Sequence, residues 1–199
     1  VSNDSFKAEV KHVVNAPNKQ HLLHLVNVQG QLAVDDTLNQ MVDCAKRAKI
    51  QCNHTATHIL QKALKLTVGD HINQAGSYVD CERLRFDFTH YEKLTNEQLA
   101  EVERRVNEEI FKAEKVTIEN MNIEEAKKRG AMALFSEKYG NEVRVVSVGD
   151  YSIELCGGCH VASSSDIGLF RIVSEESIGS GIRRIEAVTG LAAYEAFKH

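Results

Sequence analysis

The chain lacks features on which several classes of protein depend. Its 199 residues include one proline and no tryptophan, which argues against proline-rich linkers and collagen-like repeats. No window holds the roughly 18 consecutive apolar residues of a membrane-spanning helix, so we expect neither an integral membrane protein nor a membrane partner. Charged residues make up 26% and hydrophobic residues 43% of the chain, the balance of a soluble globular protein.

The chain also begins without an initiator methionine. Val1-Ser2-Asn3-Asp4 lacks the charged and then apolar layout of a secretory signal, so we expect a piece of a longer protein. The formal net charge of -4 is not that of a polycation. Any contact with nucleic acid must therefore come from local basic patches.

Cysteines are few, odd in number and unevenly spaced, at positions 44, 52, 81, 156 and 159. Without a secretory signal, this usage indicates a reducing compartment and not a disulfide scaffold, and we expect a cytoplasmic protein. Cys44, Cys52 and Cys81 are expected to be buried as small apolar residues.

Local patterns predict an α+β fold, because helices and strands are mixed without strict alternation. Residues 1–42 are expected to form a small β-rich segment with a strand near Leu23 and Leu25, and residues 43–199 a second domain. The pattern is helical from Asp43 to Lys65, with Asn53 as a candidate N-cap. The other predicted elements are helices at 95–113 and 122–130, and strands at 84–88, 143–148, 151–155, 169–173 and 182–188.

Two capping patterns support the later helices. Thr95 followed by Gln98 is a capping box, and Asn122 followed by Glu125 repeats the arrangement before a short helix that stops at Gly130. These signals fix where the two helices should begin.

The first chemically suggestive group is His54 and His58. Histidines four residues apart lie on one face of a helix and can both reach one metal ion. The pair alone is weak evidence, because such histidines are more often ordinary surface or core residues. A zinc-protease helix would also need a glutamate after the first histidine, and this chain has none there.

The second group is the turn Cys156-Gly157-Gly158-Cys159-His160, which follows a predicted strand. Thiolate and imidazole groups in a glycine-rich turn are suitable zinc ligands, although the two thiols can also be incidental to a tight turn. With the histidine pair, the turn supplies the nitrogen and sulfur ligands of tetrahedral zinc. The spacing leaves five candidate donors for four positions.

The third group is the glycine-rich run at 178–185, with Gly179, Gly181, Arg183 and Arg184. Glycines allow the backbone to approach a ligand, and adjacent arginines suit phosphate. The spacing matches neither a Walker nor a Rossmann motif. A β-turn carrying a solvated arginine pair explains the run equally well.

Several motifs resemble the editing domain of alanyl-tRNA synthetase over roughly residues 45–191, and the segment before them resembles part of that family's preceding β-barrel. They are NHTATH at 53–58, HINQAGS at 71–77, LRFDFTH at 84–90, GAMALF at 130–135, ELCGG at 154–158 and GIRRIEAVTG at 181–190. Related editing domains occur in threonyl-tRNA synthetase and in free-standing trans-editing proteins, but the runs at 85–88 and 130–135 favour the alanyl family.

The resemblance implies a zinc-dependent deacylase with the mixed helix and antiparallel-sheet fold of threonyl and alanyl editing domains. It would hydrolyse the ester that joins serine or glycine to alanine tRNA. By the same resemblance, the Zn²⁺ ligands are His54, His58, Cys156 and His160, the substrate pocket includes Thr57 and Gln74, and Gly179, Gly181, Arg183 and Arg184 lie near the tRNA end. The family usually has threonine where this chain has Cys159, which places a second thiol beside the site.

A separate hydrolytic site has a physical rationale. An apolar synthetic pocket rejects an isostere with one extra hydroxyl only about a hundredfold, so serine passes as alanine, and the smaller glycine also fits. Zinc can lower the pKa of a bound water to about 7, polarise the ester or bind the substrate amine; four protein ligands leave no open position unless one is displaced, so a role in positioning the substrate stays open beside the others.

The remaining expectations concern what lies outside the chain. We expect the rest of the parent synthetase as a partner, and ATP and Mg²⁺ only for its aminoacylating part, since the chain has no ATP-binding signature. Two alternatives remain open, a free-standing trans-editing deacylase and a tRNA-binding module whose zinc is structural.

Overall fold

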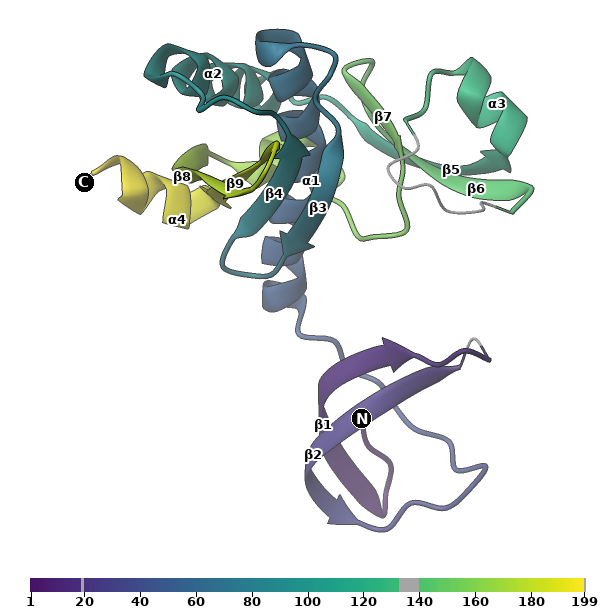
Figure 1. Cartoon of the computed structure of the whole chain (residues 1–199). Coiled ribbons are helices and arrows are strands. Elements are labelled where there is room, and N and C mark those ends of the chain that lie inside the picture. Colours follow the sequence, from purple (N-terminus) through teal and green to yellow (C-terminus); the bar gives the residue numbers. More distant parts are fainter. Residues whose placement is uncertain (19, 133–139, 199) are drawn as a thin grey trace. The chain divides into compact units, whose positions relative to one another are not determined.

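Figure 1 shows the computed structural model of the chain, which describes residues 1–18, 20–132 and 140–198. The chain divides into two compact units, Val1–Cys44 and Ala45–His199. This boundary lies two residues beyond the division after residue 42 that the sequence patterns suggest. The last part of the motif at 130–135, residues 133–135, lies outside the described residues.

The first unit is a two-stranded antiparallel sheet of β1 (Phe6–Asn15) and β2 (His21–Gly30). Val13 pairs with Leu23 and Val10 with Leu25, and two register shifts interrupt the ladder. Phe6 and Ala8 are buried. The β-rich N-terminal segment expected from the sequence is therefore confirmed.

The second unit contains all four α-helices and two antiparallel sheets of the described residues (Figure 1). One sheet has the strand order β3-β4-β9-β8 and the other the order β5-β6-β7. The helices are α1 (Cys44–Val68), α2 (Asn96–Phe111), α3 (Ile123–Lys128) and α4 (Gly190–Phe197), with a short 3-10 helix, η1, at Ser164–Ile167. The strands are β3 (Gln74–Val79), β4 (Leu84–Thr89), β5 (Val116–Asn122), β6 (Glu142–Val148), β7 (Ser152–Leu155), β8 (Phe170–Gly179) and β9 (Ile182–Thr189). The α+β class is confirmed, but the sequence patterns do not predict β3, β5 or α4.

The main core lies between α1 and the four-stranded sheet. Alternation along β4 sends Leu84, Phe86 and Phe88 to one face of the sheet, and all three are fully buried. They belong to the same apolar cluster as Ile59 and Leu60 of α1. Burial of these large side chains fixes the middle of α1 against the sheet.

Helix α1 begins at Cys44, as the helical pattern from Asp43 predicts, but Asn53 lies inside the helix and is not its N-cap. Asn53 is only 2% exposed. Its amide donates to the carbonyl oxygen of Asp80 at 2.9 Å and accepts from the hydroxyl of Thr189 at 2.7 Å. The side chain thus joins the helix to the ends of two strands, β3 and β9, at one end of the sheet.

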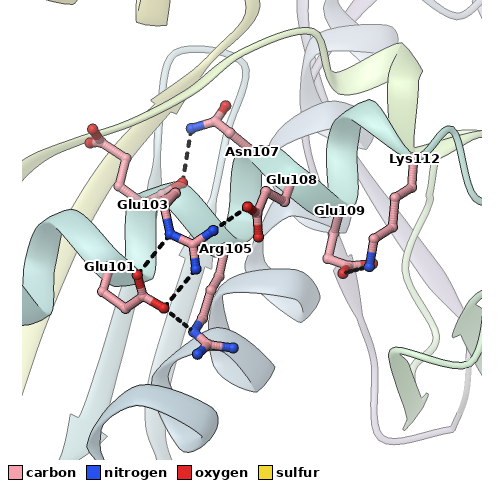
Figure 2. Close-up of polar contacts among 8 residues, drawn as sticks. Glu101, Glu103, Arg105, Asn107, Glu108, Glu109 and Lys112 are labelled. Atoms are coloured by element: carbon pink, nitrogen blue, oxygen red, sulfur yellow. Dashed lines mark hydrogen bonds and ion pairs between the residues drawn. The ribbon is translucent and has the colours of Figure 1, made fainter.

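The predicted helix at 95–113 is confirmed as α2, with both halves of the Thr95–Gln98 capping box formed. Figure 2 shows its polar face, where Glu101 contacts Arg105 at 2.7 Å. These exposed pairs contribute little stability. Asn107 docks the helix on β8 instead, because its amide donates to the carbonyl of Phe170 and accepts from the Phe170 N–H, both at 2.9 Å.

The three-stranded sheet contacts α3 along β5 and β6. Asn122 caps α3 as predicted, accepting from the N–H of Glu124 at 2.9 Å. Glu125 does not complete the predicted capping box with Asn122, because its carboxylate pairs with Arg129 at 2.6 Å. The strands predicted at 143–148, 151–155, 169–173 and 182–188 correspond to β6, β7, β8 and β9.

The expectation of three buried cysteines is wrong. Cys44 is exposed, and Cys52 and Cys81 are half-buried. The Cys52 thiol donates to the carbonyl of Asp166 at 3.3 Å, so it borders the surface of the unit and does not lie within its core. None of the helices in the described residues is long and apolar enough to cross a membrane.

Candidate metal centre

Helix α1 contributes the first two members of the site, His54 and His58. Their rings lie one helical turn apart with centroids separated by 5.3 Å. Because the surrounding turns of α1 pack into the core, His58 is only 3% exposed and His54 is half-buried. The packed helix therefore holds both rings in place.

The turn after β7 contributes Cys156 and His160. Arg144 of β6 fixes its shape, since its guanidinium donates to the carbonyl oxygens of Cys156 at 2.6 Å and Gly158 at 2.8 Å. A Cβ atom at Gly158 would lie 2.0 Å from Cε1 of His54. The turn can approach α1 this closely only with glycine at that position.

These two elements bring four donor atoms around one point. The ligand atoms of His54, His58, Cys156 and His160 all lie within 4.8 Å of one another. Nε2 of His54 and Nε2 of His160 are each 3.4 Å from Sγ of Cys156. Zinc bonds of about 2.3 Å to sulfur and 2.05 Å to nitrogen at a tetrahedral angle would separate N and S by about 3.6 Å. The group can hold a metal ion with little movement.

The tautomer of His160 follows from the hydrogen bonds of Thr55. The Thr55 hydroxyl donates its one proton to the carbonyl of Gln51 at 2.9 Å and accepts from the N–H of Val161 at 3.2 Å. Nδ1 of His160 lies 3.1 Å from the same oxygen and must therefore be the donor. Nε2 of His160 is left with a free lone pair on the side of Cys156.

Glu154 lies behind His58, and the sequence analysis assigned it no role. Oε2 of Glu154 is 3.3 Å from Nδ1 of His58, and both side chains are almost fully buried. The other carboxyl oxygen accepts from the hydroxyl of Ser152 at 3.1 Å. The sequence signal that could have indicated this contact is the position of Glu154 within a short strand, two residues before Cys156.

Burial favours the uncharged forms of the four donor side chains and of Glu154. Burial lowers the pKa of all three imidazoles, that of His160 to about 3 with the charges of His54 and Arg144 adding to the effect. Burial also raises the pKa of the Cys156 thiol, and it raises that of Glu154 to about 8 against the hydrogen bond from Ser152. Burial therefore favours the neutral imidazoles, which are the form that binds metals.

The three predicted pocket residues are not among the four donors. Thr57 is buried next to His58, and its hydroxyl donates to the carbonyl of Asn53 at 2.9 Å. Gln74 is half-buried at the start of β3. Cys159 is half-buried in the metal-binding turn, yet its thiol is not part of the donor group found among the described residues.

The predicted tRNA-end residues form the β8–β9 hairpin. Gly181 has a φ of +70°, which favours glycine in the turn. The adjacent arginines are not a solvated pair, because Arg183 is buried against Glu175. Arg184 donates to both oxygens of Asp87, at 2.7 and 2.8 Å.

The hairpin tip and the metal centre lie at opposite ends of β9. Thr189 at the end of this strand contacts Asn53, the neighbour of His54. Seven residue steps separate Thr189 from Ile182, next to the tip, a span of about 23 Å at about 3.3 Å per residue. The sequence motifs alone do not reveal this separation.

Comparison with known proteins connects this geometry to a family. The family model described as the threonyl and alanyl tRNA synthetase second additional domain matches residues 143–186, which include Cys156 and His160. An alanine–tRNA ligase of Lysinibacillus sphaericus is 58% identical over 198 residues, covering 100% of this chain and 22% of the relative. The ligase of Halalkalibacterium halodurans is 57% identical, covering 94% of this chain and 21% of the relative, and that of Bacillus cytotoxicus is 55% identical, covering 96% and 22%.

The chain thus spans about a fifth of the length of these relatives. Over its full length it is homologous to a segment of alanine–tRNA ligases, and its residues 143–186 match the model of the second additional domain of threonyl and alanyl tRNA synthetases.

Proposed function

We propose that this chain is the editing part of an alanine–tRNA ligase and hydrolyses the ester that joins serine or glycine to the 3' end of alanine tRNA. The observation that carries the proposal is the convergence of His54, His58, Cys156 and His160 on one point in a chain 58% identical to such a ligase. The rest of the synthetase and alanine tRNA are its proposed partners. A cytoplasmic location and no membrane partner belong to the same proposal.

Zinc is the proposed metal. Three imidazoles and one thiol are borderline-soft donors, and their spacing suits a tetrahedral ion. Bound zinc would supply a Lewis acid close to the ester. The proposal needs no ATP or Mg²⁺, which would serve the aminoacylating part of the longer protein.

The chain's own residues would bind and orient the substrate. Thr57 already uses its hydroxyl proton on the carbonyl of Asn53, so its oxygen can accept a hydrogen bond from the serine hydroxyl. Gln74 and Cys159 are proposed as further pocket residues. A hydrogen bond to the hydroxyl of serine is what distinguishes serine from alanine at a second site.

The hairpin residues would contact the tRNA further from its terminal ester. Gly179 leaves the backbone of the turn open to approach, because a Cβ atom there would have no heavy atom within 4 Å, whereas one at Gly181 would lie 3.0 Å from the ring of Tyr91. The guanidinium groups of Arg183 and Arg184 are engaged by carboxylates, so we propose that they shape the hairpin and offer only their remaining N–H groups to phosphate.

A deacylation assay tests the proposal. Purified chain with one zinc per molecule should release serine from serine-charged alanine tRNA, and a chain stripped of zinc by a chelator should not. Alanine-charged tRNA is the control substrate, and no ATP–pyrophosphate exchange with alanine should occur. Hydrolysis that persists at full rate after zinc removal would contradict the proposed role of the metal.

A tRNA-binding module with structural zinc is the second candidate. Four protein donors fill a tetrahedron, which is typical of structural zinc. Circular dichroism of the zinc-free chain separates the two, because loss of structural zinc unfolds the domain whereas loss of catalytic zinc leaves it folded and inactive. A free-standing deacylase remains a third possibility within the editing class, and the chain's similarity to one segment of much longer ligases argues against it.

A further inference from the structure

We propose that Glu154 is a positioning residue that accepts the Nδ1–H of His58 and thereby turns Nε2 of that ring toward the metal. The inference rests on the metal centre of the proposed function. It concerns metal binding alone, so it can fail while the deacylase proposal stands.

The placement of Glu154 needs a physical explanation. The side chain is fully buried in the middle of β7, where a carboxyl group costs free energy unless polar partners compensate it. Ser152 satisfies one carboxyl oxygen at 3.1 Å. Nδ1 of His58, at 3.3 Å, is the polar atom that faces the other oxygen.

Both atoms of this contact are otherwise unused. Within the described residues, Nδ1 of His58 and Oε2 of Glu154 are buried atoms that form no well-aligned hydrogen bond. A neutral imidazole carries one ring proton, so binding of a metal at Nε2 places that proton on Nδ1. A small rotation of the ring then completes the hydrogen bond to Glu154.

The imidazole of His160 shows the same arrangement with a different acceptor. His160 donates from Nδ1 to the hydroxyl of Thr55. Glu154 supplies for His58 the support that this hydroxyl supplies for His160, and such supporting contacts commonly set ligand orientation and basicity.

Glu154 acts through His58 and does not itself bind the ion. Its Oε2 atom approaches Nδ1, on the edge of the ring that carries no metal in this arrangement, and the donor group found in the described residues excludes Glu154. Strand pairing fixes the position, since Glu154 lies opposite Val146 of β6.

The test is zinc affinity of the full chain, measured by competition with a chromophoric chelator and without tRNA. Glu154→Ala should weaken zinc binding by about 10- to 100-fold. Glu154→Gln retains an oxygen acceptor and should recover most of that loss. Glu119→Ala is the matched control, because Glu119 is half-exposed on β5 and pairs with Arg129 at the surface, and it should bind zinc as tightly as the parent chain.

A proton NMR spectrum of the zinc-loaded chain provides the second readout. The Nδ1–H of His58 should give a downfield, slowly exchanging resonance that is present in the Glu154→Gln variant and absent from the Glu154→Ala variant. If Glu154→Ala does not fold, the Gln variant still decides the question, since loss of its resonance would overturn the proposal. Unchanged zinc affinity in a folded Glu154→Ala chain would overturn it as well.

Discussion

Replacement of Gly158 by alanine should expel His54 from the metal centre. A Cβ atom at this position lies 2.0 Å from Cε1 and 2.5 Å from Nδ1 of His54. Packed carbon atoms stay about 3.5–4.0 Å apart, so the ring and the turn must separate by about 1.5 Å or more. A zinc–nitrogen bond of about 2.0–2.1 Å tolerates a deviation of only about 0.2 Å. The imidazole therefore cannot keep its bond.

The expected loss can be calculated from the number of ligands. Zinc binding in small metal-dependent folds amounts to about 10–16 kcal/mol, or roughly 2.5–4 kcal/mol for each of four ligands. Removal of one ligand should then weaken zinc binding by roughly 100- to 1000-fold. If the turn moved instead of the ring, the steric clash would be removed only by breaking the two hydrogen bonds from Arg144, so zinc binding would still be weakened.

The neighbouring glycine provides the matched control. A Cβ atom at Gly157 would have no heavy atom within 4 Å, so Gly157→Ala should bind zinc normally. Both variants are titrated with zinc against a chromophoric chelator, and circular dichroism checks that each is folded. Equal zinc affinity of the two variants, whether both are normal or both are weak, would refute the steric explanation.

Three further predictions use other residues. Cys159→Thr should retain one zinc per chain by metal analysis whereas Cys156→Ala should lose it, and the reverse result would show that the wrong thiol was chosen. Thr57→Val should slow hydrolysis of serine-charged tRNA by roughly threefold to tenfold, since one neutral hydrogen bond contributes about 0.5–1.5 kcal/mol, and should affect glycine-charged tRNA less. Asn53→Ala leaves two buried partners unpaired and should lower the free energy of unfolding in urea by about 2–4 kcal/mol, whereas the exposed Asn18→Ala should change it by less than about 0.5 kcal/mol.

Local sequence signals predicted the elements whose stability is local. The capping box at Thr95 and the apolar repeat behind it define α2 without reference to the rest of the chain. The apolar run at 143–148 likewise predicts β6, which lies in the interior of its sheet. Strands β3 and β5 have weaker patterns, because none of the residues of β3 and only two of those of β5 are buried.

Asn53 shows how tertiary contacts override a local signal. Asparagine is a favoured N-cap, and Asn53 precedes the apolar stripe. Its amide, however, has partners at Asp80 and Thr189, which are 27 and 136 residues away in the chain. No local rule can detect such partners, so Asn53 lies inside the helix although local preference marks it as an N-cap.

The sequence by itself determined which chemical groups are available, namely two histidines one helical turn apart and a short turn with two thiols and an imidazole. It left five donors for four positions, because spacing along a chain does not define directions in space. The tertiary structure decided that His54, His58, Cys156 and His160 converge and that Cys159 does not join them. Hydrogen bonds from Arg144 and the close approach of Gly158 to His54 set the direction of each donor, and both depend on the packing of β6 and β7 beside α1.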